Sequence, residues 1–192
     1  MKRFFVFIIF LIVAFACDNI SSNKESNSAI QDSIQLYIQN AHNFELPENE
    51  VIQSLNKAQD LIKTLPRDSV YFKNKIYVAF IYDNIGKKQE FKNTVLELID
   101  EAIQAKDSFY LARAYTYLGE YYSDNVVMDS AVINFQQAEK IYFGIKDNIG
   151  IGRMHVKMAT AKHKVRDYLG SEKSAVLALT YIRLENNKLL EY

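Results

Sequence analysis

"KDSFYLARAYTYLG", residues 106–119, is followed forty positions later by "KDNIGIGRMHVKMA", residues 146–159, which aligns to it without a gap. A third copy, "RDSVYFKNKIYVAF", begins at Arg67, 39 positions before the first. A fixed period of this length predicts an array of repeated supersecondary units, each packing on its neighbours. The period therefore decides the fold class before any single element is assigned.

The repeat at 106–144 contains two stripes of side chains with helical spacing, because residues three and four positions apart share a helix face. One stripe is formed by Tyr115, Leu118, Gly119 and Tyr122, and the other by Ala131, Phe135 and Ala138. Packed helices lie about 8–10 Å apart, and the closest approach needs a small residue at the contact. We therefore expect the second helix to dock over Gly119.

These stripes resemble the tetratricopeptide repeat, which has a large residue, Leu-Gly and Tyr on its first helix and Ala, an aromatic residue and Ala on its second. The following unit has Met158, Ala159, Ala175 and Ala178 at corresponding positions. The period of about 40 residues exceeds the usual 34 and resembles the extended repeats of bacterial sensor and regulator proteins. The resemblance implies an all-α solenoid of about four antiparallel helix pairs, wound as a right-handed superhelix.

The repeat domain is expected at 28–185, with helix pairs at about 28–64, 69–105, 108–144 and 148–185. Only two prolines and six glycines occur, which favours long helices over a strand-and-turn fold. Asp68, Asp107 and Asp147 stand before the first helices of three units. A carboxylate at such a position accepts hydrogen bonds from amide groups that lack partners within the helix.

The first sixteen residues have the pattern of an export signal. Lys2 and Arg3 precede an apolar run at 4–16, as in a secretory signal peptide. A membrane-spanning helix needs about 20 residues, so this run is short for a stable span. We expect a signal peptide at 1–16, followed by a polar tether at 17–27 with too little apolar surface to pack.

Cys17 is the single cysteine of the chain and directly follows the apolar run. This arrangement resembles a bacterial lipoprotein signal, which implies lipidation of Cys17 and a place in the cell envelope, anchored to a membrane and facing the periplasm. Stable anchoring takes more than one acyl chain. Residues 14–16, Ala-Phe-Ala, also fit an ordinary signal-peptidase site, which would release a soluble periplasmic protein. Both interpretations are open.

Composition and motifs argue against nucleic-acid binding and against catalysis. The chain has 23 basic and 23 acidic residues, and loss of Lys2 and Arg3 with the leader leaves 21 against 23, so no field favours phosphates. His42, His155 and His163 lack the spacing of a helical zinc site. The sequence also lacks a phosphate-binding loop, a nucleophile elbow and a catalytic cysteine motif. We therefore expect no enzyme, no metal site and no cofactor.

The resemblance also implies a partner groove on the concave side, lined by first-helix residues between the packing positions. In this chain they are Lys73, Ile76, Phe80 and Asp83; Arg113, Thr116, Glu120 and Ser123; and Arg153, Val156, Thr160 and His163. Arg113 and Arg153 occupy equivalent places, where two guanidinium groups could hold a peptide carboxylate or an acidic side chain. The alternative is that both arginines are simply solvated.

Residues 186–192 correspond to the start of a fifth unit, and one isolated helical turn is not stable. The pair at 148–185 would then expose apolar side chains, including Val176, Leu177, Leu179 and Ile182. We expect either a partner on this face, a second copy of the chain included, or a shortened relative of a longer protein.

The repeats and the leader favour a non-enzymatic scaffold, exported and lipid-anchored, that binds a protein or peptide partner in its groove. Two alternatives are open. One is a sensory module of a truncated signal-transduction or transcriptional regulator, suggested by the long period. The other is an envelope-assembly lipoprotein resembling the tetratricopeptide lipoproteins of outer-membrane biogenesis.

Overall fold

The computed structural model describes residues 28–43 and 45–190, with side chains up to Glu185. The chain divides into two compact units, unit 1 ending at Pro66 and unit 2 beginning at Arg67. The predicted signal peptide at 1–16, the predicted tether at 17–27 and the lipidation site Cys17 all lie outside the described residues.

Unit 1 contains the predicted first helix pair. Residues 28–41 are helical, and α2 covers Glu48–Ile62. α2 starts directly after Pro47, whose φ of −57° suits entry into a helix. The helices bury apolar side chains three and four positions apart, namely Ile34, Ile38, Ala41, Val51, Leu55, Ala58 and Ile62. This periodic burial confirms the helical prediction for the segment.

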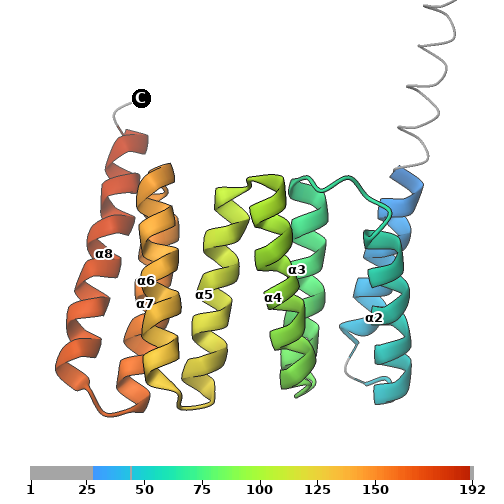
Figure 1. Cartoon of the computed structure of the whole chain (residues 1–192), viewed down its shortest axis with the longest axis horizontal. Helices are drawn as coiled ribbons and strands as arrows, with labels where there is room; N and C mark the ends of the chain where they lie inside the picture. The colour runs from blue at the N-terminus through green and yellow to red at the C-terminus, as the bar shows by residue number, and fades with distance from the viewer. Residues whose placement is uncertain (1–27, 44, 191–192) are drawn as a thin grey trace, which may run out of the picture. The chain divides into compact units, whose positions relative to one another are not determined.

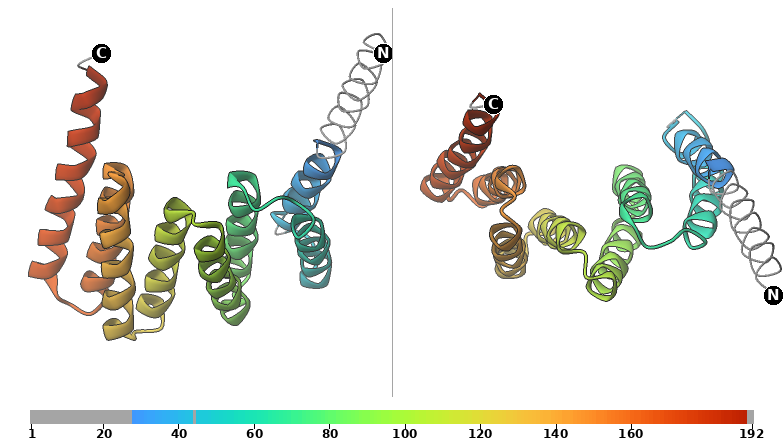
Figure 2. Two further views of the ribbon diagram at one scale, coloured as in Figure 1. Left: turned by 45° about the horizontal axis from the view of Figure 1, so that its top comes forward. Right: turned by 90° about the horizontal axis from the view of Figure 1, so that it is seen from above.

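Unit 2 is a stack of helices in sequence order (Figures 1 and 2). They are α3 (Ser69–Asn84), α4 (Lys88–Ala105), α5 (Ser108–Asp124), α6 (Met128–Ile145), α7 (Asn148–Lys164) and α8 (Tyr168–Leu190). Each helix packs on the next, and α5 also contacts α7. Every regular element in the described part of the chain is a helix, which confirms the predicted all-α solenoid of stacked pairs.

Aspartates begin the first helix of each pair in unit 2, as predicted. Oδ1 of Asp68, Asp107 and Asp147 accepts a hydrogen bond from the backbone amide three positions later, at 3.2, 3.0 and 2.8 Å respectively. These amides have no partner within their own helix, so the carboxylates satisfy them and fix where α3, α5 and α7 start.

The contact between α5 and α6 forms over Gly119, as predicted. A Cβ atom added at Gly119 would lie only 2.8 Å from two ring carbons of Phe135. The ring is 1% exposed and lies directly against the backbone of α5. Glycine is therefore required here because any side chain would occupy the space that the phenylalanine ring fills.

The other predicted packing residues are mostly buried or half-buried: Tyr115, Leu118, Tyr122, Ala131, Ala138, Met158, Ala159 and Ala178. Ala175 is the exception, since it is exposed. It stands forty positions after Phe135, and its methyl group cannot fill the volume of a ring. A hollow of about 500 Å³ lies between α7 and α8, with Ala159, Ala175 and Ala178 in its lining.

The helix α8 runs without interruption to Leu190. Residues 186–190, predicted to open a fifth unit, therefore continue α8, while 191–192 lie outside the described residues. Val176, Leu177 and Leu179 are 57%, 43% and 52% exposed, as expected. Ile182 is half-buried because it packs against Gly152 on α7.

Candidate functional site

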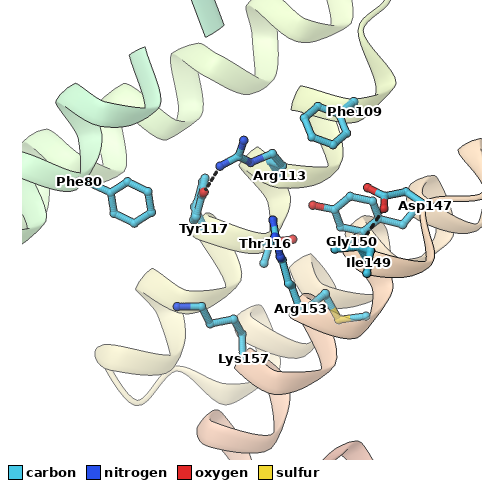
Figure 3. A pocket seen from close by; sticks show the side chains of 12 residues that line it. Phe80, Phe109, Arg113, Thr116, Tyr117, Asp147, Ile149, Gly150, Arg153 and Lys157 are labelled. Carbon is cyan, nitrogen blue, oxygen red and sulfur yellow. Dashed lines mark hydrogen bonds between the residues drawn. The ribbon is translucent and has the colours of Figure 1, made fainter. Parts of the chain in front are cut away.

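A pocket of about 230 Å³ lies in unit 2, lined mainly by α5 and α7 (Figure 3). The lining side chains come from α3, α5, α6, the turn before α7, and α7: Phe80, Phe109, Arg113, Thr116, Tyr117, Tyr142, Asp147, Ile149, Gly150, Arg153, Met154 and Lys157. Rings and aliphatic side chains thus surround two arginines from equivalent positions of successive repeats.

The side chain of Arg113 is held in position by its own helix. Its Nη2 donates a hydrogen bond to the hydroxyl of Tyr117, one turn later, at 2.8 Å (Figure 3). The guanidinium carbon also lies 5.7 Å from the ring centroid of Phe109 and 5.8 Å from those of Tyr110 and Tyr117. Aromatic faces attract a cation, so Arg113 is oriented before any ligand arrives.

Arg153 has different surroundings. It is exposed on α7, and across the described residues it makes no hydrogen bond or ion pair. Its donors therefore remain available to an incoming group. A guanidinium presents a planar set of N–H donors that matches both oxygens of a carboxylate.

The other charged side chains around the pocket are Lys157, its partner Glu120, and Asp147. Lys157 Nζ lies 2.5 Å from Glu120 Oε1 on α5. The carboxylate of Asp147 caps α7 through the amide of Gly150 and keeps its negative charge, so it offsets one of the two arginines. Neither Arg113 nor Arg153 is within ion-pair distance of a carboxylate in the described segments. The pocket therefore has a surplus of positive charge in a partly apolar surrounding, where an anionic group is favoured.

Two further polar groups limit what the pocket offers. Burial raises the pKa of Tyr142 to about 12, so its phenol is neutral near pH 7 and cannot offset the arginine charges. The hydroxyl of Thr116 is already used, since it donates to the carbonyl oxygen of Ala112 at 2.9 Å. The groups that the pocket leaves open to contact are therefore mainly the two arginines and the rings.

Four of the predicted groove residues meet in this pocket, namely Phe80, Arg113, Thr116 and Arg153. A neighbouring hollow of about 140 Å³ contains Glu120, Ser123, Val156 and Thr160. Val156, Thr160 and His163 also line the hollow between α7 and α8. The predicted groove is thus a series of adjacent depressions along α5 and α7.

Other groove predictions need correction. Ile76 is only 4% exposed, so it belongs to the core of unit 2. Thr116 and Ser123 are 7% and 4% exposed, so each offers little surface to a partner. The predictions for Lys73 and Asp83 stay open: neither lines the three hollows described above, Lys73 is exposed, and Asp83 forms an ion pair with Lys88.

The sequence did not single out Tyr117, Lys157 or Phe109 as site residues. Tyr117 and Lys157 follow Arg113 and Arg153 by four positions, the spacing at which helical side chains meet. This four-residue spacing is the sequence feature that could have identified Tyr117 and Lys157 as neighbours of the two arginines. Phe109 lies four positions before Arg113 and completes the row of rings along α5.

His155 is a buried side chain of α7 that packs against neighbouring helices. It is 3% exposed, its ring stacks on Tyr181 with centroids 6.1 Å apart, and its Nε2 lies 3.0 Å from Glu139 Oε1, off the direction of a hydrogen bond. Desolvation lowers the pKa of this imidazole, with Glu139 partly opposing the shift. No group of three or more metal-ligating side chains occurs within the described ranges.

No protein-family model matches this chain, and no curated protein matches it. Of the helices that the structure describes, none combines the length and apolar character needed to cross a bilayer.

Proposed function

We propose that this chain is a non-enzymatic scaffold that binds a protein or peptide partner in the groove along α5 and α7. The observation that supports this proposal is the shared pocket of Arg113 and Arg153, one oriented by rings and one free. The partner would place an acidic side chain or a terminal carboxylate between the two guanidinium groups. Charge-assisted bidentate hydrogen bonds would then provide both affinity and orientation.

The apolar part of the pocket adds a second requirement for the partner. Phe80 and Phe109 lie on different helices at the pocket, and Phe109 is 41% exposed. Exposed rings beside a cationic site favour a ligand that carries an apolar side chain next to its acidic group. We therefore expect short acidic segments with a neighbouring aromatic or aliphatic residue to bind better than purely acidic ones.

The repeat spacing supports a further proposal, that the chain is a divergent relative of extended tetratricopeptide repeats. The 40-residue offset recurs in the starts of α5 and α7 and in their capping aspartates. The same long period favours a second candidate function, a sensory repeat module of a signal-transduction protein. Binding of a peptide in the groove is common to both candidates.

The leader supports an exported, lipid-anchored protein in the bacterial cell envelope, with a soluble periplasmic form as the alternative. Intact-mass measurement on protein from its native membrane fraction distinguishes them, with Cys17→Ala as the control. A mass starting at Cys17 plus acyl chains, lost in the variant, is expected for the anchored form. A bare mass starting at Cys17 would identify the soluble form.

A displayed peptide library selected on the full chain tests the groove. We expect enrichment of acidic segments with an apolar neighbour. Replacing both Arg113 and Arg153 by alanine should weaken binding of a selected peptide by about tenfold or more per arginine, because each loses charge-assisted hydrogen bonds. Lys140→Ala on the exposed side of α6 is the matched control and should leave binding unchanged. Binding that survives the double substitution would exclude this pocket as the site.

A further inference from the structure

The outer face of α8, which points away from α7, carries several exposed apolar side chains. α8 contacts α7 through Ser171, which donates to the carbonyl oxygen of Ala159, and through Ser174, Ala178 and Tyr181. The opposite face carries Leu169, Val176, Leu177 and Leu184, which are 63%, 57%, 43% and 48% exposed. These four residues form one apolar strip, and a hollow of about 480 Å³ lies along part of it.

The charges on this face are ordered along the helix. Leu169, Lys173, Val176 and Thr180 repeat at spacings of four, three and four positions and form the middle of the face. Glu172 and Arg183 share one flank of this row, while Leu177 and Leu184 share the other.

Glu172 and Arg183 cannot pair with each other within one chain. They are eleven residues apart on a continuous helix, which separates them by about 16 Å along its axis. Neither forms an ion pair with any other side chain in the described part of the molecule. Glu172 and Arg183 lie toward opposite ends of the apolar strip. A second copy whose α8 runs in the opposite direction would therefore bring each of these charges close to the opposite charge.

We propose that a second copy of this chain packs antiparallel on the outer face of α8, around a two-fold axis near Val176 and Leu177. Such a contact is isologous, so each pair of residues across it occurs twice. This inference is independent of the groove along α5 and α7, which lies on other helices.

In the antiparallel register, apolar residues of one copy lie opposite apolar residues of the other. Val176 lies opposite Leu177 of the second copy, and Leu169 opposite Leu184. In an antiparallel helix pair the same flanks face each other, so Glu172 lies within about 3 Å along the axis of Arg183 of the second copy. Lys173 lies opposite Thr180, and its aliphatic stem can cover the strip while its ammonium reaches solvent.

A parallel arrangement does not satisfy these charges. It would place Glu172 level with Glu172 of the second copy, and Arg183 level with Arg183. Like charges at the same level oppose association. The charge order therefore selects the antiparallel direction, and it also disfavours a partner helix of uniform charge, which would repel one end of the face.

Thiol cross-linking in the full chain tests the register. With Cys17→Ala as background, an added thiol is the only one present. We expect a chain with Leu169→Cys to cross-link to a differently tagged chain with Leu184→Cys, and either variant alone to cross-link no more than the control. Ile133→Cys, at an equally exposed position of α6, measures random collision and serves as that control. Cross-linking of Leu169→Cys with itself would overturn the antiparallel arrangement, and yields equal to the control in every mixture would overturn the interface.

A charge exchange provides the second arm. Glu172→Arg or Arg183→Glu alone should weaken self-association about tenfold in sedimentation velocity, because each creates two like-charge contacts across the two-fold axis. The chain with both substitutions should regain the self-association of the parent chain, because the opposite charges are then paired again. A helical circular-dichroism spectrum unchanged in all three variants shows that folding is intact. A monomer at all concentrations for the parent chain, or a double variant no better than the single ones, would contradict the proposal.

Discussion

The helix pairs α5/α6 and α7/α8 are built on the same repeat, yet one is closed and the other is partly open. In α5/α6 the ring of Phe135 fills the space over Gly119 and is almost completely buried. In α7/α8 the corresponding residues are Ala175 and Ala159, and a hollow of about 500 Å³ remains. Phe135 shares a buried core with Met154 and Met158 of α7, whereas no described helix packs over Ala175, so both the side-chain volume and the covering helix separate the two contacts.

The largest difference is expected when the filling side chain is removed. Phe135→Ala should destabilise the protein by about 3–5 kcal/mol, because it removes a buried ring and leaves a cavity over Gly119. Ala175→Gly, a smaller truncation at the equivalent position of α8, should cost only about 1 kcal/mol, which is the loss of helix propensity. Free energies of unfolding from denaturant titrations measure both. Equal costs would mean that the two contacts do not differ as described.

Enlarging a side chain at equivalent positions of α5 and α7 should separate the two pairs in the same order. Gly119→Leu should destabilise by about 1–3 kcal/mol, since even a Cβ atom would lie 2.8 Å from Phe135. Ala159→Leu, at the same repeat position, extends into an existing hollow and should change stability by less than about 1 kcal/mol. Melting temperatures of the two variants decide the point, and a large loss in Ala159→Leu would show that the hollow is not available.

The turns within the pairs offer a smaller test, because their geometry is shared. Gly86, Val126 and Arg166 occupy equivalent turns with φ of 77°, 60° and 63°. The left-handed conformation is unfavourable for residues with a Cβ atom and most so for a β-branched one. Val126→Gly should therefore stabilise by about 1 kcal/mol, and Arg166→Gly by less. A lower melting temperature for Val126→Gly would contradict this assignment of backbone strain.

The smallest expected effect concerns His155, which stands in α7 where α5 has Tyr115. Its folded-state pKa is lowered by burial, so the unfolded chain binds more protons below its ordinary pKa of about 6.5. This contribution to stability is present above that pH and is lost as the pH falls through the folded-state pKa. His155→Gln should reduce the decline in melting temperature between about pH 7 and 5.

The same substitution at exposed His163, His163→Gln, is the control for the change of residue type. The groups that surround His155 are Glu139 on α6, Lys162 on α7 and Tyr181 on α8. An unchanged pH dependence in His155→Gln would show that these neighbours, rather than burial, control the imidazole.

Much of the fold could be predicted because its signals are local or periodic. Asp107 and Asp147 mark helix starts through their own side chains, and Gly119 marks the α5/α6 contact through its missing one. The exposure of Ala175 could not be predicted in this way. It depends on whether a further helix covers the pair, as α7 covers α5 and α6, and a repeat alignment does not report that.

The part of the candidate site that repeats with the period could also be predicted from the sequence. Arg113 and Arg153 follow from the period, and the structure brings them into one pocket. Burial of Ile76 and Ser123 follows instead from how closely successive helices approach, and spacing along one helix does not give that distance. The roles of Tyr117 and Phe109 appear only when the rings around Arg113 are seen in space.

A structure of the chain bound to a library-selected acidic peptide tests the central claim most directly. The account predicts a peptide carboxylate within about 3 Å of the guanidinium nitrogens of both Arg113 and Arg153, with an apolar side chain against Phe80 or Phe109. A peptide bound elsewhere on the chain, with the pocket between α5 and α7 free, would contradict it.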